Sequence, residues 1–182
     1  MSDPVSALGG ARFTGFADIR EIGPVGMITL RGKGLKAFDK AIKTAVGTKV
    51  PAQRRIEVAG DKACGWMSPD EYLLVMPYAE VPKALAAIAL ALAGQHHLAV
   101  DVSDARAVFR VEGEKAADVL RKLAPADLDL MAPGELRRTR AAQVAVAFWQ
   151  QDGGFTVVCF RSVAGYVMGL LRHSAMQGSE LA

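Results

Sequence analysis

The stretch RRTRAAQVAVAFWQQDGGFTVVCFRSVAGYVMGLL, residues 137–171, decides how this chain folds. Two apolar runs flank a turn formed by residues 151–154, and apolar residues at helical spacing follow Ser162. This pattern predicts a β-hairpin that leads into an amphipathic helix. Both runs are apolar on both faces, which is typical of central strands that are covered on two sides.

An earlier part of the chain repeats this order. Three landmarks each lie 83 positions after a similar one: Arg137 and Arg138 after Arg54 and Arg55, Trp149 after Trp66 (149 − 66 = 83), and Phe155 after Tyr72. The constant offset indicates a tandem duplication. Each half is expected to follow the order ββ-α-βββ-α, the first over residues 13–95 and the second over residues 96–176, in the α+β fold class.

Neither half looks self-sufficient, so the two are expected to form a single structural domain with one joint core. Residues 1–12 and 177–182 are expected to be flexible tails. Patterning predicts the main elements as follows: strands at residues 16–22, 25–30, 56–58, 63–66, 72–76, 98–102, 107–111, 144–149 and 155–160, and helices at residues 35–46, 85–92, 114–123 and 163–170.

Composition argues against several classes of function. The 22 Lys and Arg residues against 19 Asp and Glu give a net charge of +3, and they are scattered, whereas nucleic-acid binding needs a concentrated positive field. The most hydrophobic segment, residues 84–93, is shorter than the roughly 20 residues of a membrane-spanning helix. The N-terminus does not resemble a secretory signal, and Cys64 and Cys159 lie in apolar runs without metal-ligand spacing. These features suit a cytoplasmic location.

Arginines at corresponding positions of the two halves are the main candidate binding residues. A guanidinium could donate two hydrogen bonds to a carboxylate of a partner subunit or of a folate-like ligand. These arginines could instead line solvent-exposed strand edges and discourage unwanted pairing there. Trp66 could anchor an interface or belong to the core. The candidate partner- or ligand-binding residues are Arg54, Arg55, Trp66, Arg137, Arg138, Arg140 and Arg161.

Other polar groups fit structural roles better. His96 and His97 are adjacent, so on an extended chain they would point to opposite sides and not share a metal. Gly32-Lys33-Gly34 lacks the further residues of a phosphate-binding loop and suits a tight turn. Asp70 and Glu71 suit a solvated hairpin tip, and residues 101–104 suit a turn. No catalytic or metal-ligating residue is therefore assigned.

Several blocks of the second half occur in an order that carries a family resemblance. They are residues 101–113 (DVSDARAVFRVEG), 117–120 (ADVL), 127–128 (DL), 133–134 (PG), 138–144 (RTRAAQV) and 160–166 (FRSVAGY). Together they resemble the gamma subunit of heterotetrameric sarcosine oxidase. The resemblance is close over residues 98–171 and looser in the first half, through Gly65, Trp66 and residues 70–75.

The resemblance implies an assembly of alpha, beta, gamma and delta subunits. That assembly oxidatively demethylates sarcosine to glycine, passing the methyl carbon to tetrahydrofolate and electrons to oxygen. FAD, FMN, NAD and tetrahydrofolate would be held by the larger subunits and none by this chain. The gamma subunit is also similar to the folate-binding domain of the glycine-cleavage T-protein, a duplicated fold whose halves exchange their first strands.

One departure from the T-protein pattern concerns catalysis. T-protein relatives carry an acidic residue in the hairpin after the second-half helix, whereas residues 143–149 (QVAVAFW) contain no acid. The leading hypothesis is therefore an accessory, non-catalytic gamma subunit. A free-standing module that binds folate or another one-carbon carrier is the alternative, and an independent enzyme is the third.

Overall fold

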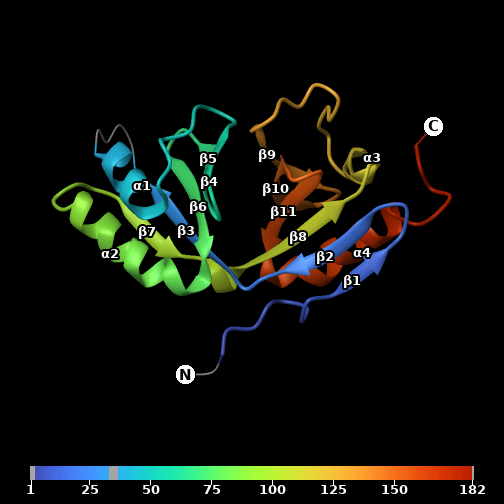
Figure 1. The fold of residues 1–182 in the computed structure, drawn as a ribbon, viewed down its shortest axis with the longest axis horizontal. Coiled ribbons are helices and arrows are strands. Elements are labelled where there is room, and N and C mark those ends of the chain that lie inside the picture. Colours follow the sequence, from blue (N-terminus) through green and yellow to red (C-terminus); the bar gives the residue numbers. More distant parts are fainter. Residues whose placement is uncertain (1–2, 33–36, 182) are drawn as a thin grey trace. The chain divides into compact units, whose positions relative to one another are not determined.

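The computed structural model describes residues 3–32 and 37–181. The chain divides into two compact units. Met1–Pro24 and Asp104–Ala182 together form the discontinuous unit, and Val25–Ser103 forms the continuous unit. Each unit has its own antiparallel sheet and its own pair of helices (Figure 1).

The discontinuous unit contains a six-stranded sheet in the order β1-β2-β8-β11-β10-β9. Its strands are β1 (Arg12–Thr14), β2 (Asp18–Ile22), β8 (Arg106–Glu112), β9 (Leu136–Ala141), β10 (Val144–Gln151) and β11 (Gly154–Phe160). Its helices are α3 (Ala116–Arg121) and α4 (Ala164–Ser174), with a 3-10 turn η3 (Arg161–Val163) before α4. The predicted hairpin is β10 and β11, which pair from Val146 with Cys159 to Gln151 with Gly154.

The continuous unit contains a five-stranded sheet in the order β4-β5-β6-β3-β7. Its strands are β3 (Val25–Arg31), β4 (Ile56–Ala59), β5 (Lys62–Ser68), β6 (Glu71–Pro77) and β7 (Leu98–Asp101). Its helices are α1 (Phe38–Val46) and α2 (Val81–Ala91), the second preceded by a 3-10 turn η1 (Tyr78–Glu80). A third turn, η2 (Ser103–Ala105), leads from β7 to β8.

The first strand of each sequence half belongs to the unit built mainly from the other half. β2 pairs with β8 in the discontinuous unit, although only Gly23 and Pro24 separate it from β3 (Figure 1). β7 likewise pairs with β3 in the continuous unit, although β8 follows it closely in sequence. The two strands have therefore changed places between the halves.

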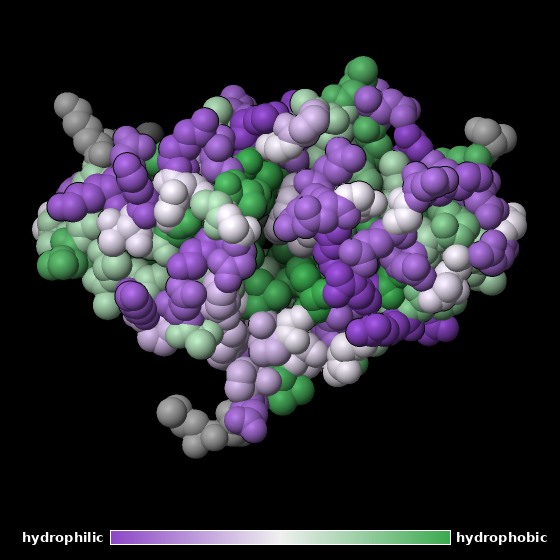
Figure 2. Space-filling view, viewed as in Figure 1, coloured by the Kyte–Doolittle hydropathy of each residue, from purple (hydrophilic) through white to green (hydrophobic). Residues whose placement is uncertain are grey.

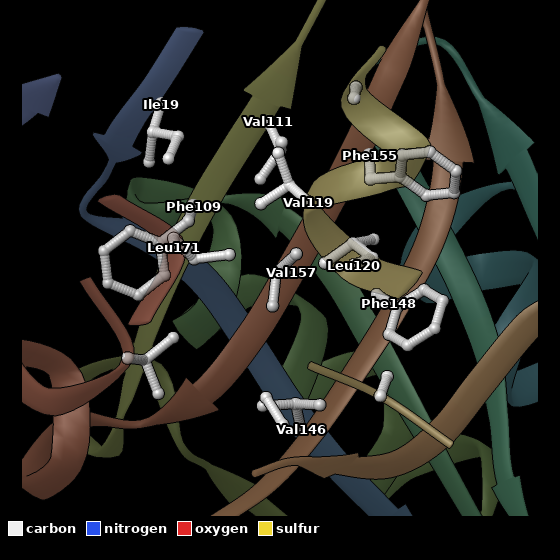
Figure 3. Close-up of a cluster of buried hydrophobic side chains, with 14 of the residues drawn as sticks. Ile19, Phe109, Val111, Val119, Leu120, Val146, Phe148, Phe155, Val157 and Leu171 are labelled. Atoms are coloured by element: carbon white, nitrogen blue, oxygen red, sulfur yellow. The ribbon is translucent and has the colours of Figure 1, made fainter. Parts of the chain in front are cut away.

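Each unit has its own cluster of buried apolar side chains. In the discontinuous unit the cluster joins the sheet to α3 and α4, with Phe109 from β8, Val157 from β11 and Leu171 from α4 (Figure 3). In the continuous unit, Ile28 and Leu74 from the sheet pack with residues of α1 and α2. Both clusters form where one sheet face meets its helices, as amphipathic helices require.

The α+β class is confirmed, and the order of elements is the predicted one apart from the additional strand β1. The order β2-β3-α1-β4-β5-β6-α2 is followed by β7-β8-α3-β9-β10-β11-α4, which gives ββ-α-βββ-α twice. Because of the exchanged strands, the units do not follow the predicted halves at residues 13–95 and 96–176. The duplication itself and a joint core shared by both halves stay predictions. Each of the two buried clusters lies within one unit.

Two local predictions differ from the structure. Residues 3–11 are not a loose tail: Ser6, Leu8 and Gly10 all donate hydrogen bonds to the Glu21 carboxylate, and β1 follows directly. The C-terminal tail is held as well, because Lys122 Nζ donates to the Ser179 carbonyl. The predicted helix start at residue 35 and the Gly32-Lys33-Gly34 turn lie partly outside the described residues.

Candidate functional site

Arg54, Arg55 and Trp66 lie at the start of the β4–β5 hairpin in the continuous unit. Arg54 is exposed in the turn before β4 and has a positive φ of 60°. The Arg55 carbonyl accepts the Trp66 backbone N–H at 2.9 Å, which closes the open end of the hairpin. Trp66 is half-buried and stands opposite Tyr72 on β6. The backbones of Arg55 and Trp66 therefore stabilise the hairpin, whereas the Arg54 side chain is exposed.

Arg137, Arg138 and Arg140 all lie on β9, but they do not form one cluster. Side chains alternate along a strand, so Arg138 and Arg140 share one face and Arg137 lies on the other. Arg138 and Arg140 are exposed, whereas Arg137 is half-buried. Arg137 Nε lies 2.9 Å from Glu135 Oε1 as an ion pair, although the N–H is not directed at the oxygen well enough for a hydrogen bond.

Arg161 binds the chain's own N-terminal segment. Its Nη1 donates to the Val5 carbonyl at 2.9 Å and its Nη2 donates to the Ser6 carbonyl at 3.1 Å. Among the described residues, Arg161 forms no hydrogen bond with any of the other six candidate binding residues. Hydrophilic side chains are spread widely over the face of the molecule in Figure 2 rather than gathered at one place.

The most elaborate polar arrangement was missed by sequence reasoning. Arg110 lies in the middle of β8 and is only 5% exposed. Its guanidinium donates to Thr156 Oγ1 at 2.9 Å and to the Gln151 carbonyl at 2.8 Å, with Glu112 Oε1 at 3.3 Å from its Nε. The signal in the sequence was a single arginine inside the apolar run AVFRV. A buried cation in such a run requires polar partners on the neighbouring strands.

Glu112 joins this network to β2. Arg20 Nε donates to Glu112 Oε2 at 2.8 Å, so two arginines share one carboxylate. The hydrogen bond from Arg20 lowers the pKa of Glu112 below its usual value, helped by the charges of Arg20 and Arg110. The same contact raises the pKa of Arg20. The carboxylate is therefore held ionised and is not suited to general acid or base catalysis at neutral pH.

The two thiols are held in their neutral form. Cys64 and Cys159 are both buried and unpaired in a disulfide. Burial raises the pKa of the Cys159 thiol to about 12, and burial also raises the pKa of the Cys64 thiol. A nucleophilic cysteine needs a lowered pKa, so neither thiol has the electrostatics of a catalytic group.

Of the other two predicted turns, Asp70 lies in the β5–β6 turn, whereas residues 101–104 contain the end of β7 and the start of η2. Ser103 Oγ donates to Asp101 Oδ1 at 2.5 Å and accepts the Met27 N–H at 2.9 Å, so this serine ties β7 to β3. Asp70 at the β5–β6 tip accepts hydrogen bonds from Ser68 and Arg31, which lower its pKa. Within residues 3–32 and 37–181, no three His, Cys, Asp or Glu side chains are placed to hold a metal ion.

A cavity of about 470 Å³ lies in the discontinuous unit between β1 and the end of α4. Its wall includes Phe13 from β1, Arg172 and His173 from the last turn of α4, and Met176, which follows that helix. The Arg172 guanidinium lies 5.3 Å from the centre of the Phe13 ring. An aromatic ring beside a cation could contact a flat ligand that carries a carboxylate.

None of the described helices is long and apolar enough to cross a membrane.

Comparison with known families gives a match over most of the chain. Residues 31–175 match the sarcosine oxidase, gamma subunit family. The sarcosine oxidase subunit gamma of an Arthrobacter species is 34% identical over 137 residues, which are 72% of this chain and 66% of that protein. The chain thus matches about two thirds of the length of that relative.

Solved structures agree with this match. A chain in the heterotetrameric sarcosine oxidase of Corynebacterium sp. U-96 superposes with a TM-score of 0.77 at 29% identity, over 87% of this chain and 83% of that one. The glycine cleavage aminomethyltransferase T of Bartonella henselae superposes with a TM-score of 0.63 at 11% identity, over 86% of this chain and 46% of that one, and shares the fold alone. On these matches, the chain belongs to the sarcosine oxidase gamma subunit family.

Proposed function

We propose that this chain is the accessory, non-catalytic gamma subunit of a heterotetrameric sarcosine oxidase in the cytoplasm. The assembly would oxidatively demethylate sarcosine to glycine and transfer the methyl carbon to tetrahydrofolate. The observation that carries the proposal is the likeness to a chain of the Corynebacterium heterotetramer over 87% of this chain. The partners would be the alpha, beta and delta subunits, and those subunits would hold FAD, FMN, NAD and tetrahydrofolate.

The chemistry of the described side chains supports a non-catalytic role. The buried thiols are protonated, and the Glu112 carboxylate is committed to two arginines. β10, the strand in which T-protein relatives would carry an acid, consists of VAVAFWQQ. A transfer of a methylene group to folate needs a base near the reacting amine, and this strand offers no carboxylate.

The candidate binding residues fall into two groups under this proposal. Arg54, Arg138 and Arg140 are exposed and would contact a partner subunit. Arg55, Trp66, Arg137 and Arg161 would act indirectly, by shaping the hairpins and the N-terminal segment of their own units. Exposed arginines can pair with carboxylates on a partner and steer its approach.

Co-expression tests the proposal directly. The chain should purify alone without flavin absorbance and without peroxide production from sarcosine. Co-expressed with the alpha, beta and delta subunits of its own source, it should co-elute in a flavin-containing complex that oxidises sarcosine. A fully active and stable complex that forms without this chain would refute the proposal.

A folate-binding module is the second candidate, and the cavity beside Phe13 favours it. A volume of about 470 Å³ is within the usual range for small-molecule sites, and Phe13 and Arg172 could contact a pterin ring and a glutamate carboxylate. Titration calorimetry of the isolated chain with tetrahydrofolate separates the two. Micromolar binding that Arg172→Ala weakens, while Arg121→Ala does not, would favour the folate module.

A further inference from the structure

Three residues spread along the N-terminal strap, residues 5–11, bind one buried carboxylate. Glu21 lies on β2 and is only 4% exposed. Its two oxygens accept Ser6 Oγ at 2.9 Å, the Leu8 N–H at 2.9 and 3.0 Å, and the Gly10 N–H at 2.8 Å. A carboxylate is buried at a large cost unless hydrogen bonds replace its water. The strap supplies these hydrogen bonds.

The strap's backbone is shaped for this contact. Gly9 and Gly10 have positive φ angles of 63° and 78°, which turn the amides of the strap toward one anion. A Cβ at either position would meet nothing within 4 Å, so the requirement for glycine comes from the backbone angle alone.

The first residues of the strap are also held by a residue far along the chain. Arg161, the first residue of η3, donates to the carbonyls of Val5 and Ser6. Ala7 and Leu8 also pack against the apolar cluster of the discontinuous unit. The strap therefore connects the N-terminal segment, which carries Glu21, to the C-terminal segment, which carries Arg161.

We propose that the strap is a clasp that seats the exchanged strand β2 in the discontinuous unit. β2 has five residues and leaves the unit at once toward β3, so its own pairing with β8 is short. On its other side, the Glu21 N–H donates to the Ala11 carbonyl at 2.8 Å, which links β2 to the end of the strap. β1 pairs with β2 on this side from Arg12 to Thr14, and the strap extends that pairing. Opening the strap would remove the Ser6, Leu8 and Gly10 donors from the Glu21 carboxylate and would shorten the support of β2 on this side.

Amide hydrogen exchange of the full chain, measured by NMR, tests the clasp. In Glu21→Gln, one carboxylate oxygen becomes an NH₂ group that faces the strap's donors. Exchange at the Leu8 and Gly10 amides should then be faster by about tenfold or more, since hydrogen bonds to a charged acceptor are lost. The amides of β2, including Glu21, should also exchange faster, while those of β5 and β6 in the continuous unit should not change.

Matched variants separate the clasp from general destabilisation. Arg161→Met should also speed exchange in the strap, whereas Glu114→Gln and Lys115→Met, at exposed positions, should leave it unchanged. Gly10→Ala is a milder probe with the same expected direction, and Gly165→Ala on the exposed face of α4 is its control. If the strap amides open in these variants while the amides of β2 keep their protection, the strap does not seat β2 and the proposal is wrong.

Discussion

Arg110 and Thr156 stand directly opposite each other on β8 and β11, and the arginine donates to the threonine hydroxyl at 2.9 Å. Both side chains are buried, at 5% and 4% exposure. The same guanidinium donates to the Gln151 carbonyl, the last residue of β10. One buried arginine thus joins three neighbouring strands at the turn of the hairpin on which the fold prediction was based.

Thr156→Val should destabilise the folded chain. Valine keeps the shape of threonine but leaves one buried N–H of Arg110 without an acceptor, which costs about 1–3 kcal/mol of the free energy of unfolding. Thr156→Ser keeps the hydroxyl and should cost less. Urea unfolding followed by tryptophan fluorescence would measure both. Equal stability of Thr156→Val and the natural chain would show that Arg110 finds another acceptor.

The Arg20–Glu112 pair should make stability depend on acid pH. The pKa of Glu112 is lowered from 4.5 in the folded chain, so the unfolded chain binds the proton more tightly. The stabilisation is therefore complete above pH 4.5 and is lost as the pH falls through the lowered pKa. Urea midpoints at pH 7 and pH 3 should differ less for Glu112→Gln than for the natural chain.

Asp70 provides an internal check on this result. Its pKa is also lowered, through Ser68 and Arg31, and it lies in the continuous unit. Some acid sensitivity should therefore persist in Glu112→Gln. An unchanged difference between the two pH values in Glu112→Gln would contradict the role given to the Arg20–Glu112 pair.

Both thiols should be unreactive in the folded chain. Cys64 is 0% exposed and Cys159 is 3% exposed, and burial raises both thiol pKa values from 9.0. At pH 8 the thiolate, which is the reactive form, should be scarce and inaccessible. Reaction with DTNB should be at least about 100-fold slower in buffer than in concentrated guanidinium chloride. Rapid release of two equivalents in buffer would rule out this protection.

Much of the fold could be predicted because local patterns agree with it. The apolar runs became β10 and β11, and the helical spacing after Ser162 became α4. The exchange of β2 and β7 was suggested only through the family resemblance, since strand partners depend on contacts far apart in sequence. Residues 3–11 were mistaken for a tail because their hydrogen bonds use backbone amides, which no side-chain pattern reveals.

The candidate site was harder to predict. Sequence symmetry selected the arginine pairs, but it cannot show that Arg137 and Arg138 point to opposite faces of β9 or that Arg161 binds the strap. Arg110 was overlooked although its position inside an apolar strand was a usable signal. Arginine in such a run is costly unless its partners lie on adjacent strands, and Thr156 is such a partner.

Arg140 allows the two interpretations of the β9 arginines to be separated. β9 is an edge strand of the six-stranded sheet, and Arg140 is exposed on it. Arg140→Thr keeps strand propensity and removes the charge. If the arginine discourages edge-to-edge pairing, the variant should self-associate at lower concentration than the natural chain, which light scattering would detect. If it contacts a partner subunit, the variant should stay monodisperse and instead lose affinity for the co-expressed complex.

Lys40→Thr, on the exposed face of α1, is the matched control for this test, since it removes one positive charge away from any strand edge. It corrects for the general loss of solubility that follows from lowering the net charge of +3. A single exposed ion pair contributes up to about 1 kcal/mol, so a partner contact through Arg140 should weaken assembly by at most about fivefold. Self-association and assembly that both match the control would exclude both roles for Arg140.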